Sequence, residues 1–147
     1  MSVRTSIDAR FQDVDAAGVL FFGRIFDYAH QAYERFWSEA GVDRAWIFSG
    51  APFLIPIVHA EADYRRVIRH GETIDVRVDV TRVGRASFRL AHRVTGPGGE
   101  GDLRAEVLTV HAFVDRGTMK PTPIPEDLRM FLLRHLVEEP LAHHPPK

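Results

Sequence analysis

Residues 22–41, FGRIFDYAHQAYERFWSEAG, carry the longest helical pattern of the chain. Apolar side chains recur there at spacings of three and four residues, which places them on one wide face of a helix. The residues of this face are Phe22, Ile25, Phe26, Ala29, Tyr33, Phe36 and Trp37. Gly41 follows at the point where a helix ends on a left-handed residue. We therefore predict one long helix from about Phe22 to Ala40, with a face broad enough to be covered by a sheet.

The stretches on both sides of this helix have the period of two that is typical of half-buried strands. Before the helix, apolar and polar residues alternate from Val3 to Phe11. After it, the pattern predicts strands at about 57–66, 74–81, 87–95 and 103–114, separated by turns and by the glycine-rich loop 96–101. In the last strand Leu108, Val110, Ala112 and Val114 form one apolar face.

The order strand, long helix, four strands, short helix indicates the fold class. The last element is a helix over about 126–136, because Pro125 fits the first helical turn. A single helix beside antiparallel strands must be covered by their sheet, since both have one apolar face to bury. The 147 residues suit one compact domain, and the proline-containing tail at 138–147 is expected to fray. We predict a single α+β domain over residues 1–147.

The composition excludes several classes of protein. Nineteen basic and twenty acidic residues leave a net charge of −1, so no positive field attracts nucleic acid. The absence of cysteine excludes disulfides, thiolate metal sites and a cysteine nucleophile. The apolar runs are far shorter than the roughly 20 residues that span a bilayer, and the first residues do not resemble a signal peptide. We expect a cytoplasmic protein with neither a membrane nor a nucleic-acid partner.

Residues 11–22, FQDVDAAGVLFF, place two acids before a turn of small residues that leads into the helix. A carboxylate there lies near the free N–H groups and the positive dipole end of the helix. The same N–H groups can polarise a carbonyl oxygen and stabilise the oxyanion formed from it. The segment therefore offers a base or nucleophile for acyl transfer beside an oxyanion hole. From the residues alone, a helix cap or Asx-turn worth about 1 kcal/mol is the commoner role of such an aspartate.

The segment from Asp13 to Phe21 resembles the signature of the 4-hydroxybenzoyl-CoA thioesterase family of hot-dog proteins: Asp-x-Asp-x-x-Gly, two aliphatic residues and an aromatic one. The similarity continues in residues 26–34, 56–64, 71–74, 83–88 and the last strand, and covers about residues 3–132. The family's fold is a five-stranded antiparallel sheet wrapped around one long helix, in agreement with the order of elements above. Relatives often have Asn-Tyr after the aromatic pair, where this chain has Gly23-Arg24, so the identity of the substrate is not carried over.

The resemblance implies a hydrolase, an acyl-CoA thioesterase acting on an aryl or a short or medium acyl-CoA. The family's catalytic acid falls on Asp15, and Asp13 is expected to hold the loop. The backbone N–H that polarises the thioester carbonyl falls on Phe22, with Gly23 as the less favoured neighbour. No metal and no cofactor are expected, because coenzyme A is part of the substrate and a thiolate whose conjugate acid has a pKa of about 8.5 leaves with little help.

The resemblance also implies residues that bind the substrate. Family members hold the phosphates of CoA at the turn between the third and fourth strands, which falls on Arg85 and, less well, on Arg82. Arginine suits this task through bidentate contacts, although a solvated surface charge is its commoner role. His59 falls where relatives line the pocket, with a structural histidine as the alternative. Gly18 of the motif is expected to lie at the bound substrate.

Three further features have open interpretations. Arg65, Arg66 and Arg69 form a second basic cluster. His30 and Glu34, four residues apart on the helix, resemble half of a metal site, but no second pair accompanies them and we predict no metal. Glu34 also falls where another branch of hot-dog thioesterases carries its catalytic acid. Members of that branch lack the motif aspartate, so the presence of Asp15 favours the first arrangement.

Two rival functions fit the same fold. A hydratase or dehydratase of acyl thioesters would need a histidine and an acid near the α and β carbons of the acyl group. A non-catalytic acyl-CoA binding module would use Asp15 only as a cap. The motif turn fits hydrolysis better than the first, and replacing Asp15 by Asn separates hydrolysis from the second, because a binding module keeps its ligand whereas a hydrolase loses turnover. Because edge strands need covering and family members pair their sheets edge to edge, with active sites at the interface, we expect a homodimer or a dimer-of-dimers homotetramer.

Overall fold

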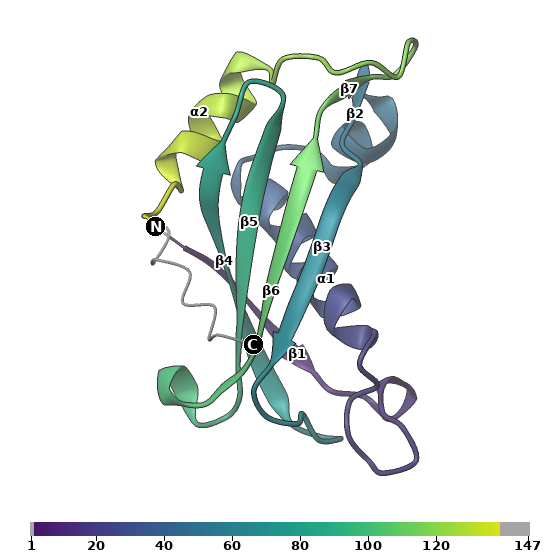
Figure 1. Cartoon of the computed structure of the whole chain (residues 1–147), viewed down its shortest axis with the longest axis vertical. Helices are drawn as coiled ribbons and strands as arrows, with labels where there is room; N and C mark the ends of the chain where they lie inside the picture. Colours follow the sequence, from purple (N-terminus) through teal and green to yellow (C-terminus); the bar gives the residue numbers. More distant parts are fainter. Residues whose placement is uncertain (1, 139–147) are drawn as a thin grey trace, which may run out of the picture.

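A five-stranded antiparallel sheet curves around one long helix (Figure 1). The computed structural model describes residues 2–138. The sheet has the order β1-β4-β5-β6-β3 and contains β1 (Val3–Asp8), β3 (Ile57–Tyr64), β4 (Thr73–Val83), β5 (Ser87–Thr95) and β6 (Leu103–Ala112). The other elements are α1 (Arg24–Glu39), α2 (Glu126–Arg134), the short strands β2 (Phe53–Leu54) and β7 (Val114–Asp115), and the single turns η1 (Phe11–Asp13), η2 (Trp46–Gly50) and η3 (Gly99–Gly101). This is the predicted α+β architecture.

Helix α1 lies on the inner face of the sheet with most of its apolar face buried. Phe36 and Trp37 are fully buried in one core cluster with Val76 of β4 and Leu90 of β5. Burial of a large apolar side chain of this kind stabilises a fold by about 1.5–3 kcal/mol. Gly41 follows the helix with a φ of 74°, a conformation that glycine adopts without steric cost. The predicted end of the helix is thus confirmed.

Helix α2 covers the end of the core beside the turn between β4 and β5 (Figure 1). Phe131 of α2 packs on Phe36 with ring centroids 4.9 Å apart. Beyond the helix the chain returns along β4, where the amide of Val137 donates to the carbonyl of Val80 at 2.8 Å. Pro125 caps the helix rather than occupying its first turn. Residues 139–147 of the predicted tail lie outside the described residues.

The first strand and the long helix are shorter than predicted. Strand β1 ends at Asp8, which pairs with Thr73 at the start of β4, and the chain then turns into η1. Phe11 is consequently 78% exposed rather than part of the core. Helix α1 begins at Arg24 and leaves Phe22 66% exposed before it. The apolar pattern continues beyond the end of β1 and before the start of α1. It depends on the residue types alone and contains no information on where strand pairing or helical hydrogen bonding stops.

The core face of β6 is the opposite of the apolar face seen in the sequence. Ala105 and Val107 are buried against the helix side, together with the polar residues Thr109 and His111. Leu108 and the other apolar residues of the predicted face are only half-buried on the outer side. The predicted face is therefore wrong, because apolar character alone does not mark the core face of a strand that places two polar side chains inside.

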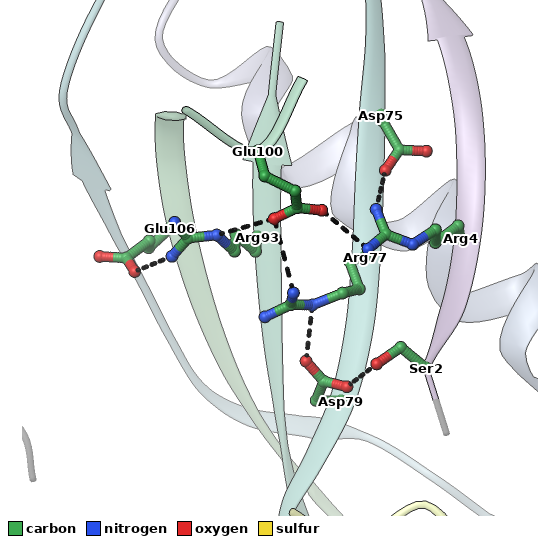
Figure 2. Close-up of polar contacts among 8 residues, drawn as sticks. All are labelled: Ser2, Arg4, Asp75, Arg77, Asp79, Arg93, Glu100 and Glu106. Carbon is green, nitrogen blue, oxygen red and sulfur yellow. Dashed lines mark hydrogen bonds and ion pairs between the residues drawn. The ribbon is translucent and has the colours of Figure 1, made fainter. Parts of the chain in front are cut away.

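Charged side chains on the outer face of the sheet bind the loop between β5 and β6 (Figure 2). The carboxylate of Glu100 accepts a hydrogen bond from Arg4 at 2.7 Å and lies 3.7 Å from Arg77 and 3.8 Å from Arg93. The hydrogen bond from Arg4 is the main cause that lowers the pKa of Glu100. Single exposed ion pairs contribute little to stability, but this one carboxylate links three strands to the loop. These arginines on the outer face of the sheet are therefore paired with a carboxylate of the same chain.

Candidate functional site

Asp13 anchors the loop between β1 and α1. The residue is 3% exposed, and Oδ2 of its carboxylate accepts a hydrogen bond from the hydroxyl of Tyr28 at 2.8 Å. Its main-chain carbonyl accepts the amide of Phe21 at 2.9 Å, and Nε of Arg24 lies 3.8 Å from Oδ1. Burial, and then the hydrogen bond to Asp13, raises the pKa of Tyr28, so the hydroxyl stays a proton donor. The expected role of Asp13 in holding the loop is confirmed.

Asp15 lies in the same loop but is exposed to solvent. Its amide donates to the carbonyl of Val19 at 2.9 Å, and its carbonyl accepts the amide of Gly18 at 3.0 Å. Gly18 has a φ of 77°, so the turn needs a residue without a β-carbon. Oδ1 of Asp15 accepts the amide of Ala17 at 2.8 Å in an Asx-turn, whereas Oδ2 accepts no hydrogen bond from residues 2–138. Asp15 closes the turn and still presents an open carboxylate oxygen.

The start of α1 presents two free backbone amides. The carbonyls of Phe21 and Phe22 accept the amides of Arg24 and Ile25, at 2.9 and 3.4 Å. The amides of Phe22 and Gly23 donate to no acceptor in the described part of the chain. As the N-cap residue, Gly23 brings no side chain that could satisfy them. Two N–H groups at the positive end of the helix dipole are thus available to an incoming oxygen.

A cavity of about 550 Å³ lies between α1 and the strands β3, β5 and β6. Phe26, Tyr33 and Ile57 are among its walls, and Arg10 and Asp27 place one of its ends beside the loop and the first turn of α1. The volume is within the range of small-molecule sites. The lining does not include Asp15 of the same chain. The cavity is a candidate site for an acyl group.

The wall formed by β5 and β6 is polar although it is fully buried. His92 and His111 are each 1% exposed, and Nε2 of both lies within hydrogen-bond distance of Oγ1 of Thr109, at 3.0 and 2.8 Å. The ring of His111 is stacked between Tyr33 and Phe88, at centroid distances of 4.4 and 4.8 Å. Burial lowers the pKa of both histidines to about 3, so both rings are neutral near pH 7.

The hydroxyl of Thr109 has a single proton, so it can donate a hydrogen bond to only one of the two histidines, His92 or His111. If the hydroxyl donates to one histidine, it accepts from the other. One ring then carries its proton on Nδ1 and the other carries it on Nε2. The Nδ1 atoms of His92 and His111 have no partner among residues 2–138, so together they offer one free donor and one free acceptor. The sequence analysis did not identify these residues.

Arg82 and Arg85 lie far from Asp15 of the same chain. Strand β4 has eleven residues, which at about 3.3 Å per residue separates its two ends by roughly 30 Å. Its first residue, Thr73, pairs with Asp8 next to the loop, whereas the two arginines lie at the turn at its other end (Figure 1). A single chain therefore does not bring the predicted phosphate contacts to the predicted catalytic residue.

The other two predicted binding residues, His59 and Gly18, lie in different parts of the structure. The His59 side chain lies 3.2 Å from Glu61, which borders a separate hollow on the outer face, so it does not reach the cavity. Gly18 lies in the turn closed by Asp15, and its carbonyl accepts the amide of His70 at 3.1 Å. The main chain of Arg69 bridges to Val19 and is adjacent to this turn.

His30 and Glu34 both border the cavity. Within residues 2–138, no three His, Cys, Asp or Glu side chains gather into a group that could hold a metal ion. In the same range, no helix combines the length and the apolar composition needed to cross a membrane.

Known proteins share both the sequence pattern and the fold. Residues 9–132 match the family described as the thioesterase-like superfamily. A 1,4-dihydroxy-2-naphthoyl-CoA hydrolase of Synechococcus elongatus is 33% identical over 124 residues, which are 84% of this chain and 89% of that protein. A 1,4-dihydroxy-2-naphthoyl-CoA thioesterase from Synechocystis has a TM-score of 0.83 at 22% identity, covering 90% of this chain and 96% of that one. A DHNA-CoA thioesterase from Staphylococcus aureus has a TM-score of 0.82 at 20% identity, covering 90% and 89%.

These relationships define the protein as a thioester hydrolase of the hot-dog fold. The predicted fold class is thereby confirmed. The chain belongs to the thioesterase-like superfamily. Its narrower resemblance to the 4-hydroxybenzoyl-CoA thioesterases remains a prediction.

Proposed function

We propose that this chain hydrolyses an acyl-CoA thioester to CoA and the free acid, with Asp15 as base or nucleophile. The observation that carries the proposal is the loop before α1, where the open Oδ2 of Asp15 and the free amides of Phe22 and Gly23 belong to one short segment. The Asx-turn of Asp15 occupies only Oδ1. The carboxylate of Asp15 can therefore close the turn through Oδ1 and still act on a substrate through Oδ2.

The chemistry needs few groups. Ionised Asp15 either takes a proton from a water that attacks the thioester carbonyl carbon, or attacks that carbon itself to form a mixed anhydride that water then cleaves. In both routes the carbonyl oxygen becomes an oxyanion, which the amides of Phe22 and Gly23 stabilise. The carbon–sulfur bond then breaks and CoA leaves as a thiolate. The proposed mechanism assigns no step to a metal or a cofactor.

We further propose that the acyl group is aromatic and carries a hydroxyl. Relatives of the chain are named as 1,4-dihydroxy-2-naphthoyl-CoA hydrolases, and the cavity has aromatic walls. His92 and His111 border this cavity, and their Nδ1 atoms offer one donor and one acceptor, which are groups that hydroxyls pair with. A plain alkyl chain would leave these buried atoms without a partner, at a cost of about 1–3 kcal/mol each.

The proposed assembly is a homodimer, or a dimer-of-dimers homotetramer. Strand β3 lies at the edge of the sheet and is exposed along nearly its whole length. An open strand edge invites pairing with another strand, so we propose that a second copy covers it. Asp15 lies outside the lining of its own chain's cavity. The assembled site would then combine the Asp15 loop of one copy with the cavity of the other.

Arg82 and Arg85 stay our proposed contacts for the CoA phosphates, but only as residues that a neighbouring copy supplies. Arg69 is adjacent to the loop on the same chain and serves as the comparison. We expect Arg85→Gln to raise KM for acyl-CoA with little change in kcat, and Arg69→Gln to have the smaller effect. A rise in KM that is confined to Arg69→Gln would move the phosphate site to the loop.

The decisive experiment measures thiol release from aryl- and alkyl-CoA esters by wild type and Asp15→Asn. Asparagine keeps the Asx-turn but has no charge, so the fold should survive while kcat falls about 10²- to 10⁴-fold. The matched control is Asp43→Asn, because exposed Asp43 makes the same turn contact, with Oδ1 accepting the amide of Ala45 at 3.0 Å. We expect this control to be fully active.

Glu34→Gln distinguishes the two possible acids, since Glu34 borders the cavity. Our proposal expects Glu34→Gln to retain most of the turnover. A collapse of turnover in Glu34→Gln with an active Asp15→Asn would transfer the catalytic role to the helix. If wild type cleaves no ester but binds acyl-CoA, the binding module becomes the better description, and hydration of an enoyl-CoA without thiol release would indicate the hydratase.

A further inference from the structure

Tyr64 connects the edge strand of the sheet to the start of α1. It is the last residue of β3, and its hydroxyl donates a hydrogen bond to the main-chain carbonyl of Phe22. Side chains alternate along a strand, so Tyr64 lies on the same face of β3 as Ala60, which borders the cavity. The contact joins two segments that are 42 residues apart in the sequence.

The accepting carbonyl belongs to the same peptide group as one of the free amides. In a trans peptide the carbonyl of Phe22 and the N–H of Gly23 lie in one plane and point in opposite directions, and the described residues contain no cis peptide. The carbonyl is held by the hydroxyl of Tyr64 and by the amide of Ile25 at 3.4 Å. The N–H on the other side of the plane has no acceptor among residues 2–138. Holding the carbonyl therefore fixes where this N–H points.

The same hydrogen bond changes the strength of the N–H as a donor. A donor on a peptide carbonyl draws electron density towards the oxygen and leaves the N–H more positive. Such cooperative strengthening is estimated at roughly 10–30% per bond. Burial raises the pKa of Tyr64, so its hydroxyl stays protonated near pH 7 and keeps this donor role.

We propose that Tyr64 is a positioning residue of the oxyanion hole, which orients and polarises the Phe22–Gly23 peptide so that the Gly23 N–H meets the thioester oxygen as negative charge develops. This inference rests on the proposed thioesterase function. Tyr64 itself need not touch the substrate. It acts through the peptide plane, and its contribution should appear mainly in the transition state, where the oxygen carries its charge.

The first test is Tyr64→Phe, which removes the hydroxyl and keeps the ring. Loss of one oxyanion donor typically costs 10²- to 10³-fold in kcat, so loss of a 10–30% share of its strength should lower kcat by about twofold to eightfold. KM should change by less than about twofold, and the melting temperature should stay near that of wild type. The matched control is Thr73→Val, which removes an exposed tether from the Thr73 hydroxyl to Asp8 at 2.6 Å and should leave kcat unchanged.

A second test replaces Tyr64 by fluorinated tyrosines, which retain the shape of the ring but have a more acidic phenol. While the phenol is protonated, a more acidic one donates a stronger hydrogen bond, so kcat should rise with fluorination. At a pH where the fluorinated phenol ionises, the phenolate cannot donate and kcat should fall, with the inflection moving to lower pH as fluorine is added. A merely structural tether would show neither trend.

The outcomes separate this inference from the function on which it rests. An unchanged kcat in Tyr64→Phe, a change in KM alone, or a loss of melting temperature that accounts for the lost turnover would each overturn the role of Tyr64. None of these results affects the assignment of Asp15 if Asp15→Asn is inactive. A fully active Asp15→Asn would instead overturn the proposed function, whatever Tyr64 does.

Discussion

The carboxylates of Asp13 and Asp15 lie two residues apart in one loop and in opposite environments. The Asp13 carboxylate is buried and accepts a hydrogen bond from the hydroxyl of Tyr28. The Asp15 side chain is exposed, and within residues 2–138 its carboxylate accepts a hydrogen bond from the amide of Ala17 alone. One acid therefore holds the loop and the other is open to a ligand. Substitutions at the two positions should have different signatures, in stability at Asp13 and in turnover at Asp15.

Tyr28→Phe should lower the free energy of unfolding by about 1–3 kcal/mol, because it leaves the buried carboxylate of Asp13 without its closest donor. Urea unfolding of Tyr28→Phe, Asp13→Asn and the double variant measures the coupling between the two side chains. We expect the double variant to lose clearly less than the sum of the two single losses. Additive losses would mean that the hydrogen bond contributes nothing by itself.

Thr109→Val should weaken the distinction between hydroxylated and unsubstituted aryl-CoA esters. The change keeps the shape of the side chain but removes the proton that orders His92 and His111. We expect the ratio of kcat/KM for 1,4-dihydroxy-2-naphthoyl-CoA over 2-naphthoyl-CoA to fall about tenfold, the equivalent of one lost hydrogen bond. The control Thr81→Val removes a hydroxyl that faces the carbonyl of Arg89 at 3.5 Å and should leave this ratio unchanged. An unchanged ratio in Thr109→Val would remove the polar wall from substrate recognition.

The stability of the fold should fall as the pH is lowered below about 6.5. His92 and His111 have pKa values of about 3 in the folded chain, well below the ordinary histidine pKa of 6.5, so the unfolded chain binds more protons between these limits. The stability is fully present above pH 6.5 and is lost towards pH 3, at up to about 1.4 kcal/mol per pH unit for each histidine. Urea unfolding between pH 7.5 and 4.5 measures the slope. It should be clearly shallower in His92→Gln than in wild type, and equal slopes in the two proteins would contradict the assignment.

A charge on the exposed edge of the sheet should dissociate the proposed assembly. Val58 of β3 is 60% exposed, and Val58→Asp would place a carboxylate on the surface that a second copy is proposed to cover. We expect sedimentation to show a smaller species and thioesterase activity to fall with it. Val67→Asp, at a residue that is 50% exposed beyond the end of β3, is the control. A smaller species with full activity would mean that one chain carries a complete site.

The sequence pattern correctly predicted the boundaries that depend on residues adjacent in the sequence. The strand from Ser87 to Thr95 was predicted with its correct limits, because it is bounded by a turn and a glycine-rich loop. Gly41 marked the end of the helix for a similarly local reason. Phe11 and Phe22 were wrongly assigned to a strand and a helix, because their burial depends on where distant partners stop pairing.

The candidate site was only partly visible in the sequence. The motif indicated Asp15 and the amides at the start of α1, because both lie in one continuous segment. His92 and His111 interrupt inward-facing apolar series on neighbouring strands, and this interruption is a signal that the sequence does contain. Tyr64 had no local signal, since its partner is 42 residues away.

The sequence by itself determined the order of the elements, the wide apolar face of the helix and the acidic turn before it, because each depends on residues close together in the chain. Only the tertiary structure decided which side chains meet. The register between β5 and β6 brought Thr109 between two histidines, and the length of β4 placed Arg85 at the opposite end from Asp15. Strand register and curvature arise from packing of the whole sheet on α1, and no short stretch of sequence contains that information.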